Sequence, residues 1–197
     1  MDEVREQSER DYQLASGLSP DVETDDNVLR QTTARLPWLL IGMIGGIGNS
    51  MILGNFDSTF AAHPEMALYI PLIGGTGGNV GTQSSALVVQ GLANSSLDAK
   101  NTFKQVSKEA VVALINATII SLLVYTYNFI RFGATATVTY SVSISLFSVV
   151  MFASIFGTLV PMTLEKMKID PAIATGPFIA ITNDIIGMMM YMGITVL

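Results

Sequence analysis

The 197-residue chain contains no cysteine and a single histidine, His63. The lack of cysteine excludes disulfides, cysteine-ligated zinc or iron–sulfur centres and thiol catalysis. One histidine argues against a histidine-based metal centre or a Ser-His-Asp triad. Only 13% of the residues are charged, compared with roughly 25% in a typical soluble domain, whereas 50% are hydrophobic. This composition excludes an ordinary soluble protein.

The few charges are unevenly distributed along the chain. Of the 16 acidic residues, nine lie in the first 26 positions, and the net charge is -6. No basic cluster offsets them, so nucleic acid is not an expected partner. We expect residues 1–33 to form an acidic, polar, cytoplasmic leader. Within it, Ser19, Pro20 and Asp21 match a helix-start signal and predict a short helix at about 20–35.

Five apolar segments follow the leader, at about 36–56, 66–93, 110–130, 140–164 and 171–197. Each is long enough to cross ~30 Å of hydrocarbon at ~1.5 Å per residue. The sequence therefore predicts an all-α membrane protein in which residues 34–197 form a domain of five transmembrane helices.

Basic residues predict how these segments are oriented. Of the 10 lysines and arginines, all except Arg131 precede the first segment or lie between the second and third or the fourth and fifth. Because basic loops stay in the cytoplasm, we expect a cytoplasmic N-terminus and a C-terminus outside. An odd number of spans cannot form two equal inverted halves, so a symmetric pathway would need two or more copies of the chain.

Asp184 is the ionisable side chain that lies well inside an apolar segment. A carboxylate in hydrocarbon costs at least ~2.5 kcal/mol, so it normally faces a cavity, a cation or a polar partner. Its helical face carries small residues, including Gly176, Ala180 and Gly187. Such a face suits either a backbone-lined passage or close helix packing. A protonated aspartate bonded to a neighbouring helix is the structural alternative.

Residues 71–93 read PLIGGTGGNVGTQSSALVVQGLA, with five glycines between positions 74 and 81. Glycines four residues apart match the small-xxx-small face on which membrane helices pack. The functional alternative is a locally opened helix whose free carbonyls line water, which is tolerated only beside a cavity. Neutral oxygens here, together with Asp184, would suit a hard cation. The candidate ion-facing positions in this segment are Gly75, Gly78, Asn79, Thr82 and Gln83.

Three strings and the spacing between them resemble a known family. They are RLPWLL at 35–40, the glycine-rich string at 71–93, and GTLVPMTLEKMKIDPAIATGPFIAITNDIIG at 157–187. Together they resemble the transmembrane domain of MgtE-type magnesium channels and their eukaryotic relatives. The likeness covers the chain from about residue 35 to its end.

The resemblance implies a homodimer of five-span subunits in the cell membrane, surrounded by lipid, with a magnesium pore at the subunit interface. It implies that Asp184 is the pore carboxylate and that Ala180 and Gly176 offer backbone on the same wall. It also implies that Asn79 and its neighbours line the pore from the second span. Family members carry a large cytosolic sensor and a plug helix before the pore. With only about 33 residues before the first span, regulatory cytosolic domains are expected to be absent from this chain, and the leader is the candidate plug.

These features favour a divalent-cation channel or transporter that moves Mg²⁺, and not an enzyme. Mg²⁺ usually keeps several waters, so one carboxylate per subunit among neutral oxygens fits the hydrated ion. Other divalent cations are further candidates. One alternative is a proton- or sodium-coupled carrier in which Asp184 titrates. An intramembrane aspartyl enzyme is another, although it needs two facing carboxylates and one chain supplies one. A non-transporting scaffold is the third.

Overall fold

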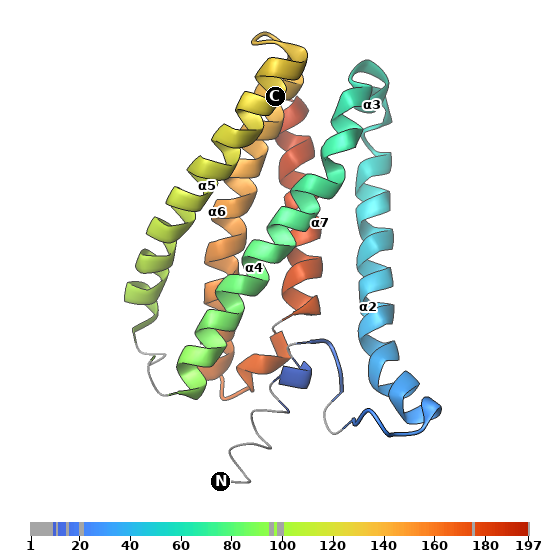
Figure 1. Ribbon diagram of the computed structural model, residues 1–197, viewed down its shortest axis with the longest axis vertical. Helices are drawn as coiled ribbons and strands as arrows, with labels where there is room; N and C mark the ends of the chain where they lie inside the picture. Colours follow the sequence, from blue (N-terminus) through green and yellow to red (C-terminus); the bar gives the residue numbers. More distant parts are fainter. Residues whose placement is uncertain are drawn as a thin grey trace.

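The computed structural model describes residues 10, 12–14, 16–19, 22–94, 97, 101–174 and 176–196. Within these residues the structure is helical, and successive long helices run in alternating directions (Figure 1). Each of the five predicted apolar segments contains one long helix. These helices are α2 (Val28–Gly54), α4 (Ile70–Ala93), α5 (Thr102–Phe132), α6 (Thr137–Lys166) and α7 (Pro177–Val196). The shorter elements are α3 (Asp57–Ala62) and the 3₁₀ turns η1 (Pro64–Tyr69) and η3 (Pro171–Ala174).

Four helices in the described part of the chain are long and apolar enough to cross a membrane, namely α2, α5, α6 and α7. An all-α membrane protein is therefore confirmed. Helix α4 has 24 residues, which is also a spanning length at ~1.5 Å per residue. Its glycines and polar side chains make it less apolar than the other four. It crosses the bundle diagonally and packs against α6 and α7 (Figure 1).

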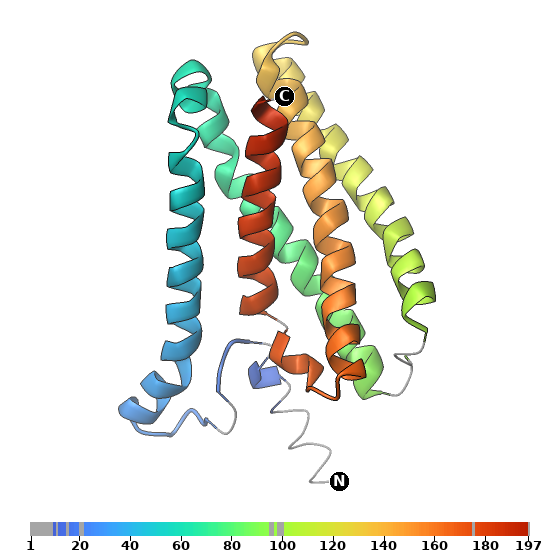
Figure 2. The ribbon, with the colours of Figure 1, turned by 180° about the vertical axis from the view of Figure 1, so that it is seen from behind.

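Helix α6 forms the centre of the bundle, in contact with α4, α5 and α7. It is buried around much of its circumference because small and β-branched residues recur on several of its faces. Val142, Leu146 and Val149 belong to the main apolar cluster, where they meet Ile73 of α4 and Tyr191 of α7. Figure 2 shows α7 between α6 and α2, with α2 at the edge of the bundle. The exposed apolar residues are concentrated on α2 and α5, which is the pattern expected for helices that face lipid.

Glycine residues, which have no side chain, allow α4 and α6 to approach backbone to backbone. A Cβ placed on Gly157 of α6 would overlap the carbonyl oxygen of Gly81 and lie 3.1 Å from that residue's Cα. A Cβ placed on Gly77 of α4 would lie 2.9 Å from a methyl group of Val149. Membrane helices gain stability from such close approach because lipid tails are as apolar as the side chains they replace. These glycines fix the separation of the two helices.

Buried tyrosines tie the helices together at the end of the bundle that contains η1. The hydroxyl of Tyr69 donates a hydrogen bond to Oδ1 of Asn128 on α5. The hydroxyl of Tyr191 on α7 donates to the Met66 carbonyl at 2.9 Å. Both bonds join η1 to a helix distant in sequence.

The predicted leader helix at about 20–35 is wrong in its start and its end. Residues 22–27 are not helical, and the helix begins at Val28 with Asn27 as its N-cap, whose side chain accepts from Arg30 N at 2.9 Å. Before this cap, Glu23 N donates to Asp26 Oδ2 at 2.8 Å, which closes a turn instead of a helix. Helix α2 then continues through Pro37 into the apolar segment, and its lower end is bent (Figure 1).

We expect Gly157→Ala to lower the free energy of unfolding by ~1–3 kcal/mol, because its methyl group would force the α4 backbone away. Gly46→Ala is the matched control, since a Cβ there meets no atom within 4 Å. Thermal unfolding of the purified proteins in the same detergent measures the difference. Equal transition temperatures for the two variants would contradict the close contact between α4 and α6.

Candidate ion site on α4 and α7

Asp184 lies half-buried on α7 where this helix packs against the glycines of α4. A Cβ placed on Gly74 would lie 3.3 Å from Asp184 Oδ1, and one on Gly78 would lie 3.5 Å from the same oxygen. No hydrogen bond or ion pair to the Asp184 side chain is recorded among the described residues. A carboxylate inside a membrane helix without a partner raises the free energy of the folded protein unless water or a cation reaches it.

Ala180 stands on the same wall, one helical turn before Asp184. Its Cα and Cβ would each lie 3.7 Å from a Cβ placed on Gly78. The structure therefore brings Asp184, Ala180 and Gly78 together, as their predicted shared site requires. Gly176 lies just before α7 in the left-handed region, at φ 58°, and its carbonyl accepts from Ala180 N at 3.0 Å. That bond closes the first turn of the helix below the aspartate.

Of the two alternatives for the glycine-rich segment, the locally opened helix is wrong. Helix α4 is continuous from Ile70 to Ala93, so its backbone bonds remain within the helix. The packing alternative describes these glycines correctly, because Gly74 and Gly78 face α7, and Gly77 and Gly81 face α6 and the inner side of α7. Close packing supplies enough contact to keep the helix intact despite the low helix propensity of glycine.

A polar flank on α4 lies next to this seam and is uncovered in the single chain. Gly75 and Asn79 are exposed, and a Cβ on Gly75 would meet no atom within 4 Å. At ~100° per residue, both residues lie within about 100° of Gly78 around the helix. Thr82 is on this flank too, but its hydroxyl donates to the carbonyls of Gly78 (2.8 Å) and Asn79 (3.0 Å). The Thr82 hydroxyl proton is therefore used within the helix, and the hydroxyl oxygen keeps a lone pair that can accept a hydrogen bond.

Asn183, next to Asp184 in sequence, belongs to a different environment. It is fully buried, and its amide nitrogen would overlap a Cβ placed on Gly81. Neither side-chain atom of its amide has a hydrogen-bond partner among the described residues. It thus fills the space that Gly81 leaves between α4, α6 and α7, and it does not share the aspartate's wall.

Sequence reasoning missed a second buried carboxylate, Glu109 of α5. Glu109 lies near the start of its helix and close to lysines, a position that in sequence is typical of an ordinary interfacial charge. It is instead only 9% exposed, and its Oε1 accepts from the hydroxyls of Ser84 (2.6 Å) and Ser154. The available signal was the spacing, since Ala113 and Ala117 follow at four-residue steps and form the buried stripe of α5.

The predicted site residue Gln83 lines the same cavity as Glu109, about 140° around α4 from Gly78. This cavity of about 480 Å³ lies between α4, α5 and α6, and Val80 and Leu87 also line it. Val80 is two residues from Gly78, and so it points to nearly the opposite side of α4. The described residues contain no group of three acidic or histidine side chains that could hold a metal. Any ion would therefore meet isolated carboxylates among neutral oxygens.

Comparison with known proteins identifies the family to which this arrangement of helices belongs. A family model, MgtE, described as a divalent cation transporter, matches residues 70–194, from the start of α4 almost to the end of α7. The chain belongs to the MgtE family. The matched part includes α4 and α7, on which Gly78, Ala180 and Asp184 form the Asp184 wall, and the whole central helix α6. It also includes Glu109 and the residues that line its cavity.

Curated MgtE proteins show the same likeness over most of the chain. It is 30% identical to the magnesium transporter MgtE of Bacillus subtilis (strain 168), over 98% of this chain and 43% of that protein. It is 32% identical to the magnesium transporter MgtE of Thermus thermophilus, over 82% of this chain and 35% of that protein. The corresponding protein of Enterococcus faecalis is 27% identical over 98% of this chain and 42% of its own length. The chain thus spans less than half the length of these MgtE relatives.

We expect valine at position 78 to separate α4 from α7, because Ala180 and Asp184 leave room for one methyl group but not for three carbons. Gly78→Val should lower the free energy of unfolding by ~1–3 kcal/mol, and Gly78→Ala by less. Gly75→Val carries the same side chain into open space and should stay within ~0.5 kcal/mol of the parent. Thermal unfolding in detergent compares the three variants. Destabilisation by valine that is equal at both positions would show that α4 does not pack on α7 through Gly78.

Proposed function

We propose that the chain conducts hydrated Mg²⁺ across the membrane, with Asp184 as the carboxylate that faces the ion. The half-buried, unpartnered position of Asp184 beside the uncovered polar flank of α4 carries this proposal. The family's description as a divalent cation transporter and the relatives' printed name, magnesium transporter, support the choice of ion. Other divalent cations of similar chemistry are candidate substrates.

The donor chemistry supports a hydrated ion over a dehydrated one. Asp184 offers a single carboxylate beside the backbone of Gly74 and Gly78, and the exposed flank of α4 next to it carries the amide of Asn79. Mg²⁺ gives up its waters reluctantly and commonly binds through one or two carboxylates, with water completing the octahedron. The open space beside Gly75, where a Cβ would meet no atom within 4 Å, leaves room for those waters. Weak water-mediated contacts also allow the ion to leave again, as conduction requires.

We further propose that two copies form the pathway, with the polar flank of each α4 and the Asp184 of each α7 facing a common axis. A polar helix flank is unfavourable against lipid but favourable against water or a second copy. In this arrangement α4 also crosses the membrane, so each copy has five spans. The distribution of lysine and arginine supports a cytoplasmic N-terminus and an external C-terminus. Two symmetry-related carboxylates would then bind the ion from opposite sides.

Residues 1–33 are proposed as a cytoplasmic leader that contacts the mouth of this pathway. Gly17 lies against Pro177, the first residue of α7, and near Trp38 of α2. Ser19 N donates to the Ala34 carbonyl at 3.0 Å, which attaches this segment to the start of α2. The contact at the beginning of α7 supports the comparison with a plug, since Gly176 directly precedes Pro177 and Ala180 lies three residues after it.

Asp184→Asn should reduce Mg²⁺ uptake into proteoliposomes by about tenfold or more, because loss of ~1.4 kcal/mol of ion binding already changes occupancy by that factor. Asparagine keeps the size of the side chain and removes its charge, so assembly should be preserved. Glu165→Gln, at an exposed carboxylate near the end of α6, is the charge-matched control and should transport like the parent.

Uptake is measured at equal protein incorporation with an Mg²⁺-sensitive dye inside the vesicles. Near-parental uptake by the asparagine variant would refute a role for this carboxylate in the pathway. Uptake that follows an imposed proton or sodium gradient, and saturates with Mg²⁺, would replace the channel with a coupled carrier.

A further inference from the structure

The cavity between α4, α5 and α6 is large, mixed in chemistry and separate from the Asp184 wall. It has a volume of about 480 Å³, and its lining combines amide side chains, two serines, aliphatic side chains and one residue of each charge. Helices α4 and α5 make no extended contact with each other, whereas both pack on α6, which closes the cavity from behind. The lining residues used below are Ser84, Leu87, Lys108, Glu109, Val112 and Ser154.

Glu109 supplies a buried acceptor at the inner end of this cavity. Its Oε1 accepts from the hydroxyls of Ser84 and Ser154, which hold the carboxylate in place. No hydrogen bond to Oε2, and no ion pair to Glu109, is recorded among the described residues. A carboxylate that is 91% buried in a membrane helix normally meets a positive group. The free side of this carboxylate is therefore suited to a cationic hydrogen-bond donor.

Lys108 supplies the opposite charge at the exposed rim. It is adjacent to Glu109 in sequence, so the two side chains leave α5 about 100° apart. Lys108 is exposed, and no ion pair between the two residues is recorded in the described chain. The formal charges of the cavity lining sum to zero. A bare metal cation would be repelled by the lysine, and an anion by the glutamate, whereas a zwitterion satisfies both groups.

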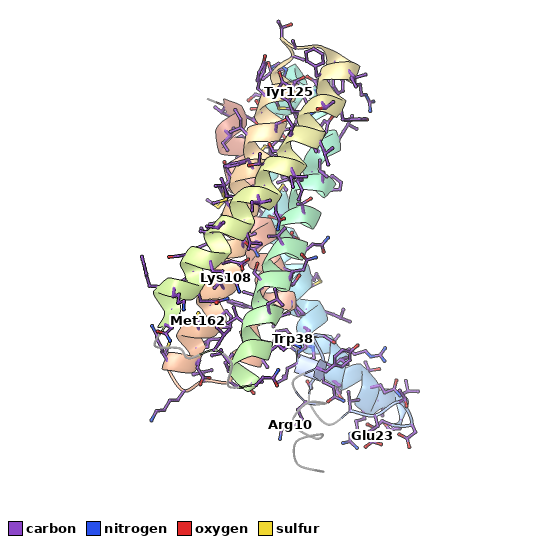
Figure 3. All side chains as sticks on the ribbon, turned by 60° about the vertical axis from the view of Figure 1, so that its left-hand side comes forward. Arg10, Glu23, Trp38, Lys108, Tyr125 and Met162 are labelled. Atoms are coloured by element: carbon purple, nitrogen blue, oxygen red, sulfur yellow. The ribbon has the colours of Figure 1, made fainter. Side chains whose placement is uncertain are left out.

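The open side of the cavity faces lipid at the depth of the headgroups. Leu87 is 63% exposed and Val112 42% exposed, so apolar surface borders the polar lining. Helix α5 has 31 residues, or ~46 Å at ~1.5 Å per residue, which exceeds ~30 Å of hydrocarbon. Glu109 is ~10 Å from the start of this helix, close to the hydrocarbon boundary. Figure 3 shows Lys108 near this end of α5, with Tyr125 near the other end.

We propose that this cavity binds a phospholipid whose headgroup carries a primary ammonium beside its phosphate, as in phosphatidylethanolamine. The ammonium donates to Glu109 in the cavity, the phosphate accepts from Lys108 at the rim, and an acyl chain lies along Leu87 and Val112. Basic pockets between membrane helices are recognised binding places for phosphate-bearing lipid headgroups, and Lys108 supplies the basic group here. The proposal depends on membrane insertion alone, because the cavity lies on the opposite side of α4 from Asp184.

The test compares lipids that differ only at the amine. Purified protein is equilibrated in nanodiscs that contain equal amounts of phosphatidylethanolamine and phosphatidylcholine with identical acyl chains, and retained lipid is then counted by native mass spectrometry. We expect the parent to retain at least about fivefold more of the primary amine lipid, since three methyl groups remove every N–H donor. Stepwise N-methylated lipids should lose retention in order, a measurement that needs no variant.

Glu109→Gln should bring the ratio of the two lipids to about one, because an amide no longer selects an ammonium by charge. Lys108→Gln, at an exposed position, should weaken retention of both lipids while keeping their ratio. Glu165→Gln is the charge-matched control outside the cavity and should behave like the parent. Size-exclusion profiles and circular dichroism confirm that the variants are folded.

Three results would overturn the proposal: equal retention of the two lipids by the parent, an unchanged preference in Glu109→Gln, or no retained lipid because a second copy covers the opening. A drop of one bound Mg²⁺ per chain in Glu109→Gln, without any lipid preference in the parent, would identify a metal site instead. Mg²⁺ uptake by Asp184→Asn reports on the transport proposal separately.

Discussion

The close approach of α4 to α6 and α7 is the constraint on which the rest of the structure depends. It rests on backbone meeting backbone at Gly81 and Gly157, and on the absence of side chains at Gly74 and Gly78. In lipid, hydrophobicity does not drive helices together, so contact area and complementary shape have to do so. This contact holds α4 as a continuous helix, places its glycines against Asp184, and turns its opposite side toward the Glu109 cavity.

The five long helices could be predicted because apolar length is a property of the local sequence. The residue at which each helix starts depends on which capping side chain is used, and that choice is determined less by the local sequence than apolar length is. Ser19 and Pro20 form an acceptable helix-start signal, but Asn27 caps the helix instead, and Asp26 closes a turn before it. The sequence also did not decide whether the glycine-rich segment forms a continuous helix or a locally opened one. Packing partners from α6 and α7, which are distant in sequence, decide that it remains helical.

The two buried carboxylates differ in how visible they were in the sequence. Asp184 stands out because apolar residues surround it for many positions in both directions. Glu109 has Lys108 directly beside it and Lys104 five residues before it, so the same residue type looks like an interfacial charge. Its burial arises from Ser84 and Ser154 on two other helices, and no local pattern reports those partners. Gln83 lines the Glu109 cavity, about 140° around α4 from Gly78 but about 40° from Asn79. Polarity alone does not say which of these neighbours its side chain faces.

The composition of α4 also has a consequence for how the protein is made. Glycine and serine give this helix little to gain from entering lipid alone, and Ser84 finds its hydrogen-bond partners on α5 and α6. The helices that cover it, α6 and α7, are synthesised after it. Stable insertion of α4 is therefore coupled to the arrival of later segments at the translocon. The wall that contains Asp184 is completed only after α7 has left the ribosome and packed against α4.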